Sequence, residues 1–164
     1  MNIQRRKLTA VVLGLMFVLW MADIATAQSA TNNCKRLRAQ SPQVFDPVSG
    51  VISGPVTNGG ILNGTLEDVV NFGGGVVVTP DPNVVAYTSD LKITTSDGVL
   101  RSHPVTAQSL ITGAGTEFGN IDPNTSTGRF AGATGVIYFV FKLAGDPITG
   151  PWEAEIKADI CFVN

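Results

Sequence analysis

The sequence predicts an all-β, antiparallel fold, a sandwich or a barrel, preceded by a cleaved signal peptide. Three observations lead to this prediction. Basic residues precede an apolar stretch at the start of the chain. Beyond it, apolar side chains alternate with polar ones, and no segment shows the 3.6-residue period of an amphipathic helix. Turn-forming Gly, Pro, Asn and Asp separate these runs at short intervals, as between the strands of a sandwich or barrel.

The first residues read as an export signal. Two arginines and a lysine at 5–7 precede the apolar stretch 8–21, and the small residues Ala-Thr-Ala at 25–27 form a cleavage site. A retained membrane anchor is the weaker alternative, because a span needs about 20 apolar residues. A twin-arginine signal fits poorly with the residues that follow the arginines. We therefore expect removal of 1–27, a secreted or periplasmic location, and no membrane contact after cleavage.

The exported part has the size of one domain. Residues 28–164 number 137, enough to bury a single core, and we expect a polar lead segment at 28–43 followed by a β-barrel or sandwich domain at 44–164. Removal of 1–27 takes three of the 11 basic and one of the 13 acidic side chains, which leaves a net charge of −4. This balance argues against a nucleic-acid partner, because phosphate binding needs clustered Lys and Arg. The basic cluster at 35–38 is interpreted as a solvated patch.

Both cysteines, Cys34 and Cys161, lie in the exported part, near its two ends. In an oxidising compartment an even pair predicts a disulfide. Closing so long a loop is nominally worth about 4 to 5 kcal/mol in the chain-entropy model. Two cysteines and the single His103, without paired C-x-x-C spacing, are too few for a zinc site. We expect no metal and no cofactor.

The clearest strand is predicted at 152–162. Trp152, Ile156 and the other even-numbered positions share an apolar face, while charged residues and Cys161 share the opposite face. Because Cys161 then points away from the core, the disulfide should tie the lead segment to the outside of the sheet.

A β-hairpin is predicted around Asp97-Gly98. Tyr87, Leu91 and Ile93 share the apolar face of the preceding run, and a second β-rich run covers 99–112. The Asn-Gly-Gly at 58–60 plays the same part between strands at 51–56 and 61–72.

The run 136–141 differs from the others because it is apolar on both faces. Something must cover its outer side. The cover is either the lead segment, held by Cys34, or another subunit.

A glycine-rich segment precedes that run. Gly128, Gly132 and Gly135 match neither the dinucleotide pattern nor the phosphate loop, and a strand follows where both would need a helix. We interpret these glycines as a turn, a bulge and a close backbone approach, with Phe130 fixed in the core.

The segment TGRFAGATG at 127–135, followed by an apolar strand and a terminal strand ending in ADICFV, resembles the signature of the allene oxide cyclase and dirigent-like β-barrels. It resembles in particular small exported bacterial proteins with this signature. The resemblance covers roughly 84–163. It implies an antiparallel barrel of about eight strands with a largely apolar cavity, often assembled as homotrimers. Members of the superfamily steer the cyclisation or coupling of apolar, reactive intermediates.

No catalytic residue carries over, because the catalytic acids, tyrosines and arginines of the superfamily lie outside the shared signature. Arg129 and Phe130 belong to the signature, and we expect them to hold the turn and fill the core.

Few ionisable side chains are candidates for a site. If Asp97-Gly98 is a two-residue turn, His103 lies opposite Lys92 on the polar face, which favours a surface role over a catalytic one. Glu117 and Asp90 serve as general acid or base only if folding brings them inside. Tyr87 is interpreted as a core residue, with a place in the wall of a ligand cavity as the alternative.

Three functions remain open: a barrel that binds a small apolar molecule, a structural or surface-interaction protein, and a cyclase-like or dirigent-like enzyme. The first is favoured, because small closed barrels commonly enclose such a cavity. The expected cavity residues are Tyr87, Leu91, Ile93, Trp152 and Ile156.

Overall fold

The computed structural model describes residues 33–71, 77–146 and 150–163. The predicted signal peptide and its cleavage site lie outside these ranges. Within them, no helix is long and apolar enough to cross a membrane.

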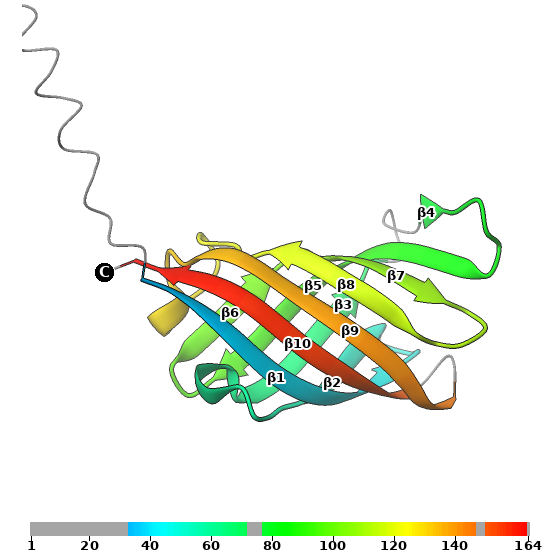
Figure 1. The fold of residues 1–164 in the computed structure, drawn as a ribbon, viewed down its shortest axis with the longest axis horizontal. Coiled ribbons are helices and arrows are strands. Elements are labelled where there is room, and N and C mark those ends of the chain that lie inside the picture. Colours follow the sequence, from blue (N-terminus) through cyan, green and yellow to red (C-terminus); the bar gives the residue numbers. More distant parts are fainter. Residues whose placement is uncertain (1–32, 72–76, 147–149, 164) are drawn as a thin grey trace, which may run out of the picture. The chain divides into compact units, whose positions relative to one another are not determined.

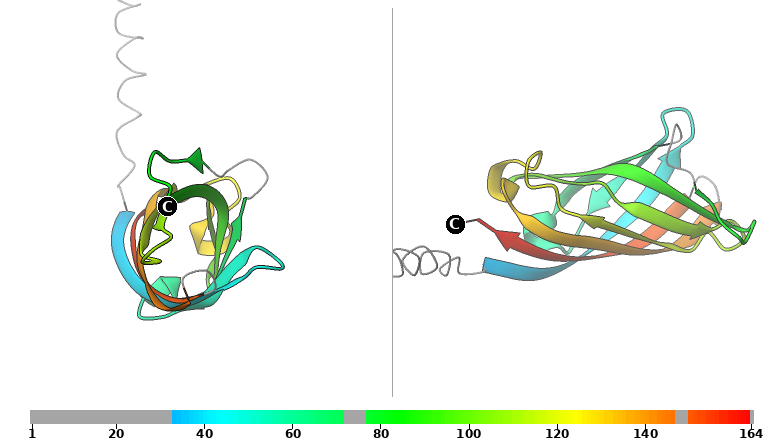
Figure 2. Two further views of the ribbon diagram at one scale, coloured as in Figure 1. Left: turned by 90° about the vertical axis from the view of Figure 1, so that its right-hand side faces the viewer. Right: turned by 90° about the horizontal axis from the view of Figure 1, so that it is seen from above.

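The described residues form a closed antiparallel β-barrel (Figure 1). The strands are β1 Asn33–Asp46, β2 Val51–Val56, β3 Gly64–Val70, β4 Val77–Val78, β5 Val84–Thr95, β6 Gly98–Ser102, β7 Val105–Ser109, β8 Gly115–Asn120, β9 Thr134–Asp146 and β10 Gly150–Phe162. The sheet order is β3-β2-β1-β10-β9-β8-β7-β5, and pairing of β3 with β5 closes the ring seen in Figure 2. The all-β prediction is confirmed.

The closed ring is eight strands around. β6 and β7 count as one position, because they pair with successive parts of the same strand, β5. His103 and Pro104 separate the two. Proline cannot donate a hydrogen bond to a neighbouring strand, which accounts for a break at this position. The short β4 pairs with β5 outside the closed ring.

The expected boundary between a lead segment at 28–43 and the barrel is wrong, because β1 begins at Asn33 and is a strand of the barrel. It pairs with β10 from Asn33↔Phe162 to Gln43↔Trp152. Its inward positions carry short or polar residues such as Ala39 and Ser41, so the sequence lacks the apolar alternation of a barrel strand.

The disulfide between Cys34 and Cys161 is confirmed. The two residues face each other directly in the β1–β10 pairing. The bond therefore links two neighbouring strands of the wall and does not strap a separate segment over the sheet.

The hairpin between β5 and β6 is also confirmed, with a shifted turn. Thr95 pairs with Gly98, so that Ser96 and Asp97 are the two turn residues, and Gly98 has a φ of 145° that suits glycine. As a result Lys92 pairs with Arg101. The expected pairing of His103 with Lys92 is wrong.

The two-sided apolar run lies in β9. Ile137, Phe139 and Phe141 point inward and are buried, while Tyr138 and Val140 are exposed on the outside of the wall. The lead segment is not their cover, because β1 lies beside β10 within the wall. Assembly of subunits through this face, as in a homotrimer, stays a prediction.

One half of the interior is a packed hydrophobic core, which we call the apolar half. Two short 3-10 helices, η1 Gly60–Leu62 and η2 Gly128–Phe130, lie at this end of the barrel, on the left of Figure 1. The buried residues of the apolar half are Val56, Leu62, Leu66, Ile93, Leu100, Ile121, Phe130, Ala133, Ile137, Ala158 and Ile160.

The glycine-rich segment provides the turn and the close backbone approach predicted for it, but the predicted bulge is absent from the described pairings of β9, whose register shifts only near Gly150. Phe130 is fully buried in the core. Gly135 has a φ of 132°, and a Cβ atom on it would lie 1.9 Å from the Asp159 carbonyl oxygen. Arg129 forms an ion pair with Asp97 and lies over the Phe162 ring, and so joins η2 to the β5–β6 turn and to β10.

Candidate functional site

The other half of the interior is lined with polar side chains, and we call it the polar half. It lies towards the end at which β3 finishes and β5, β8 and β10 begin. Strand alternation points these side chains inward, since their neighbours in sequence are more exposed. The residues are Ser41, Gln43, Asp68, Tyr87, Ser89, Thr106, Gln108, Glu117 and Trp152.

Two carboxyl groups stand out in the polar half: Asp68 on β3, which is 2% exposed, and Glu117 on β8, which is 6% exposed. Neither oxygen of Asp68 has a hydrogen-bond partner among the described residues, and neither does Oε1 of Glu117. The Thr106 hydroxyl donates a long bond of 3.4 Å to Glu117 Oε2. A buried carboxylate without partners is costly, because desolvation of the charge is not repaid.

The protein environment favours the protonated form of both acids. Burial raises the pKa of Asp68 to about 7; the nearby Ser89 hydroxyl opposes this shift, and the negative charge of Asp90 adds to it. Burial also raises the pKa of Glu117 well above its usual range, and the charge of Asp68 raises it further. The Tyr87 pKa is raised by burial and by both carboxyls, so that Tyr87 stays a neutral phenol.

Further unpartnered atoms lie in the same half. The hydroxyl oxygens of Ser41 and Ser89 and the indole Nε1 of Trp152 are buried and make no hydrogen bond of good geometry among the described residues. Together with three carboxyl oxygens they make six such atoms. The Ser89 hydroxyl lies near Asp68 and lowers its pKa, but its geometry does not complete a hydrogen bond. Buried polar groups are normally paired with protein or water, so their concentration here marks the site.

The described residues include no buried cation that could neutralise the two acids. Every lysine, arginine and histidine in the described ranges is exposed or half-buried. The polar half can therefore accept hydrogen bonds and positive charge from a molecule that enters it, and Asp68 can exchange a proton near neutral pH.

The five residues expected to line a cavity are all buried, and four of them, Leu91, Ile93, Trp152 and Ile156, belong to the hydrophobic cluster. Tyr87 is outside that cluster, and Trp152 joins it to the polar half through its unpartnered indole Nε1. All five point into the barrel, as the alternation predicts. Contact of any of them with a ligand stays a prediction.

Sequence reasoning named Glu117 as an acid or base on condition that it faced inward, and the structure places it there. Asp68 was missed. Its signal was the alternation Leu66, Asp68, Val70, which puts a carboxyl on the buried face of β3.

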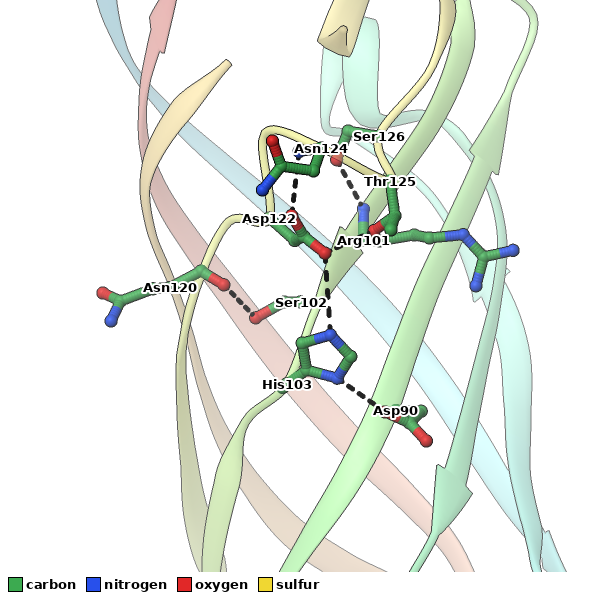
Figure 3. A network of polar contacts seen from close by, with 9 residues as sticks. All are labelled: Asp90, Arg101, Ser102, His103, Asn120, Asp122, Asn124, Thr125 and Ser126. Atoms are coloured by element: carbon green, nitrogen blue, oxygen red, sulfur yellow. Dashed lines mark hydrogen bonds and ion pairs between the residues drawn. The ribbon is translucent and has the colours of Figure 1, made fainter. Parts of the chain in front are cut away.

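His103 lies outside the barrel, as expected (Figure 3). Its Nδ1 is 2.6 Å from Asp90 Oδ1 and its Nε2 is 3.7 Å from Asp122 Oδ2. The side chains of His103 and Asp90 are 66% and 62% exposed. Asp90 is therefore not an interior acid, and the cluster joins β5 to the loop after β8 at the surface.

The described ranges contain no group of three His, Cys, Asp or Glu residues that could hold a metal ion. No protein-family model, curated protein or solved structure matches the chain.

Proposed function

We propose that this is an exported β-barrel protein that binds a small molecule in the polar half of its interior. The observation that carries the proposal is the set of six buried polar atoms without partners, all in that half. Each such group lowers stability by about 1 to 3 kcal/mol when it stays unpaired. A bound molecule that pairs with these groups offsets this cost.

The side chains of the polar half also indicate which kind of ligand fits. A wholly apolar molecule would leave the oxygens of Asp68 and Glu117 unpaired. A better fit is a molecule that donates hydrogen bonds to the two acids and packs an apolar body against Trp152 and Phe141. The ligand that fits is amphipathic.

Two features support export. The chain begins with basic residues and an apolar stretch that resemble a signal peptide. The Cys34–Cys161 disulfide suits an oxidising compartment.

An NMR screen tests the binding proposal. The full-length protein, labelled with ¹⁵N, is titrated with a library of small amphipathic compounds, and the indole N–H of Trp152 is the reporter. Binding should shift this resonance and the backbone amides of Thr106 and Glu117, which lie on neighbouring strands. The outward-facing residues Glu155 and Lys142 are the control, and their amides should stay unchanged. A screen in which no compound shifts the interior amides would favour a structural barrel without a ligand.

A second candidate function is acid–base catalysis, such as the cyclase-like or dirigent-like reactions that the sequence resemblance implies. The observation that favours it is the pair of buried acids with raised pKa values beside the Tyr87 phenol. Conversion of a bound compound into a product, lost in Glu117→Gln but kept in His103→Ala, would support the enzyme.

A further inference from the structure

Building on the proposed binding function, we propose that the natural ligand is an organic cation whose positively charged nitrogen lies between Asp68 and Glu117. The two carboxyls come from β3 and β8, and both point into the polar half. The proposal specifies the class of ligand for the site described above.

The hydrogen-bond inventory of the site favours an ammonium group. Three of the unpartnered atoms are carboxyl oxygens: Oδ1 and Oδ2 of Asp68 and Oε1 of Glu117. An ammonium group carries three donors and no acceptor. It therefore matches the unpaired oxygens, whereas a carboxylate ligand would add acceptors where acceptors are already in excess.

The charge of the site points the same way. The groups that face the two acids are the Tyr87 phenol and the hydroxyls of Ser89 and Thr106, all of them neutral. No described lysine, arginine or histidine is buried beside them. An anionic ligand would add a negative charge beside acids that burial already disfavours as anions, whereas a cation would be neutralised by the carboxylates whose ionisation it favours.

The walls of the site complete the match. Trp152 and Tyr87 are buried aromatic side chains of the polar half. Aromatic faces attract organic cations more strongly than neutral molecules of the same shape, and the attraction grows when water is excluded.

Cation binding should be coupled to proton release. The free protein holds protons on the acids at slightly acidic pH, because burial raises the pKa of both. A bound cation favours the ionised carboxylates and so displaces these protons. Affinity for a cation should rise as pH rises towards about 7, by up to about tenfold per pH unit through Asp68, and Glu117 should act in the same direction. Among the facing groups only Tyr87 titrates, and its pKa lies above that range.

The test compares three probes of similar shape and different charge by isothermal titration calorimetry with the full-length protein. They are 2-phenylethylammonium, 2-phenylethanol and 3-phenylpropanoate. We expect the ammonium to bind at least about tenfold more tightly than the alcohol, equivalent to about 1.4 kcal/mol, and the propanoate to bind most weakly. Ammonium binding should release protons, seen as a heat that depends on the ionisation enthalpy of the buffer.

Variants then locate the site. Asp68→Asn and Glu117→Gln keep the shape of the side chain, and each should weaken ammonium binding by about tenfold or more while changing alcohol binding less than threefold. Glu155→Gln is the matched control, since Glu155 is an exposed carboxyl on the outer face of β10, and it should leave both affinities unchanged.

The outcomes separate the two proposals. Tighter binding of the alcohol or the propanoate, or ammonium binding that persists in both variants, would overturn the cation inference and leave the binding function intact. Absence of binding by all three probes, together with a negative amphipathic screen, would overturn both. If a variant does not fold, the cation inference is still tested on the unaltered protein by the order of the three affinities and by the proton release.

Discussion

The two halves of the barrel interior are built from the same strands. They differ in whether their buried side chains are packed or hydrogen-bonded by the protein itself. In the apolar half, Leu62, Phe130 and Ile160 are fully buried, and η1 and η2 lie at that end. In the polar half, Asp68 and Glu117 are also buried but lack partners. Stability therefore comes mainly from one half, and the other half holds groups whose cost a ligand can offset.

The boundary between the halves runs across single strands. On β3, Leu66 belongs to the core and Asp68, two residues later, is an unpartnered acid. On β5, Tyr87 and Ser89 precede Leu91 and Ile93 on the same face. A change at one position of a strand should therefore act differently from a change two residues away.

The largest effect is expected in the apolar half. Phe130→Ala should lower the free energy of unfolding by about 3 to 5 kcal/mol, because it leaves a cavity where a fully buried ring was packed. Urea unfolding, followed by far-UV circular dichroism, measures this loss. Phe118→Ala is the control: Phe118 is 47% exposed, and its removal should cost less than about 1 kcal/mol. Equal losses at both positions would contradict the assignment of the core to the apolar half.

In the polar half we expect one substitution to stabilise the folded protein. Asp68→Val removes two unpartnered oxygens from the buried face of β3 and should raise the free energy of unfolding at pH 8 by about 1 to 3 kcal/mol. The same urea titration checks it. Glu67→Val is the matched control on the outer face, where Glu67 pairs with Lys92, and it should change stability by less than about 1 kcal/mol. A destabilised Asp68→Val protein would show that Asp68 has a structural partner.

The third prediction concerns pH. The folded protein binds protons on Asp68 and Glu117 at pH values where the unfolded chain has released them, since both pKa values are raised. The free energy of unfolding should therefore fall as pH rises from about 4 to about 7 through Asp68, by up to about 1.4 kcal/mol per pH unit, and Glu117 should add a loss of the same sign. Thermal melts at four pH values measure the slope.

The variant that tests the source of this slope is Asp68→Asn, which should flatten it. Asp46 and Asp122 have lowered pKa values, through hydrogen bonds from Ser49 and Thr125, and so act only at more acidic pH, with the opposite sign. Stability that rises with pH across the neutral range would contradict the assignment to buried acids.

The smallest effect is expected outside the barrel. His103→Ala removes an exposed contact with Asp90 and should change the free energy of unfolding by less than about 1 kcal/mol. Ligand affinity in the calorimetric test should stay within twofold of the unaltered protein. A large loss of binding would mean that the outer cluster, and not the polar half, positions the ligand.

The features that depend on short-range patterns could be predicted from the sequence. The alternation of β10 and the positive-φ glycines around Phe130 are examples. The disulfide followed from composition and compartment. The first strand was missed, because Ala39 and Ser41 occupy inward positions where a core residue is usual.

The site depended on information that no local pattern holds. Asp68 and Glu117 lie far apart in the sequence, and they come together only because β3 pairs with β5 and closes the ring. The pairing partner of His103 was predicted wrongly because the turn is shifted by one residue. Such a shift changes the partner of every residue in the hairpin.

The pairing of β1 with β10 determines the order of events during synthesis. These two strands hold the first and last described residues of the barrel, and they pair along eleven positions, from Asn33↔Phe162 to Gln43↔Trp152. A ring cannot close before its last strand has left the ribosome, so the barrel stays open until β10 has emerged. Contacts of such long sequence separation also slow folding. The export proposed above would use this delay, because a chain that is still open can cross a membrane before its disulfide forms.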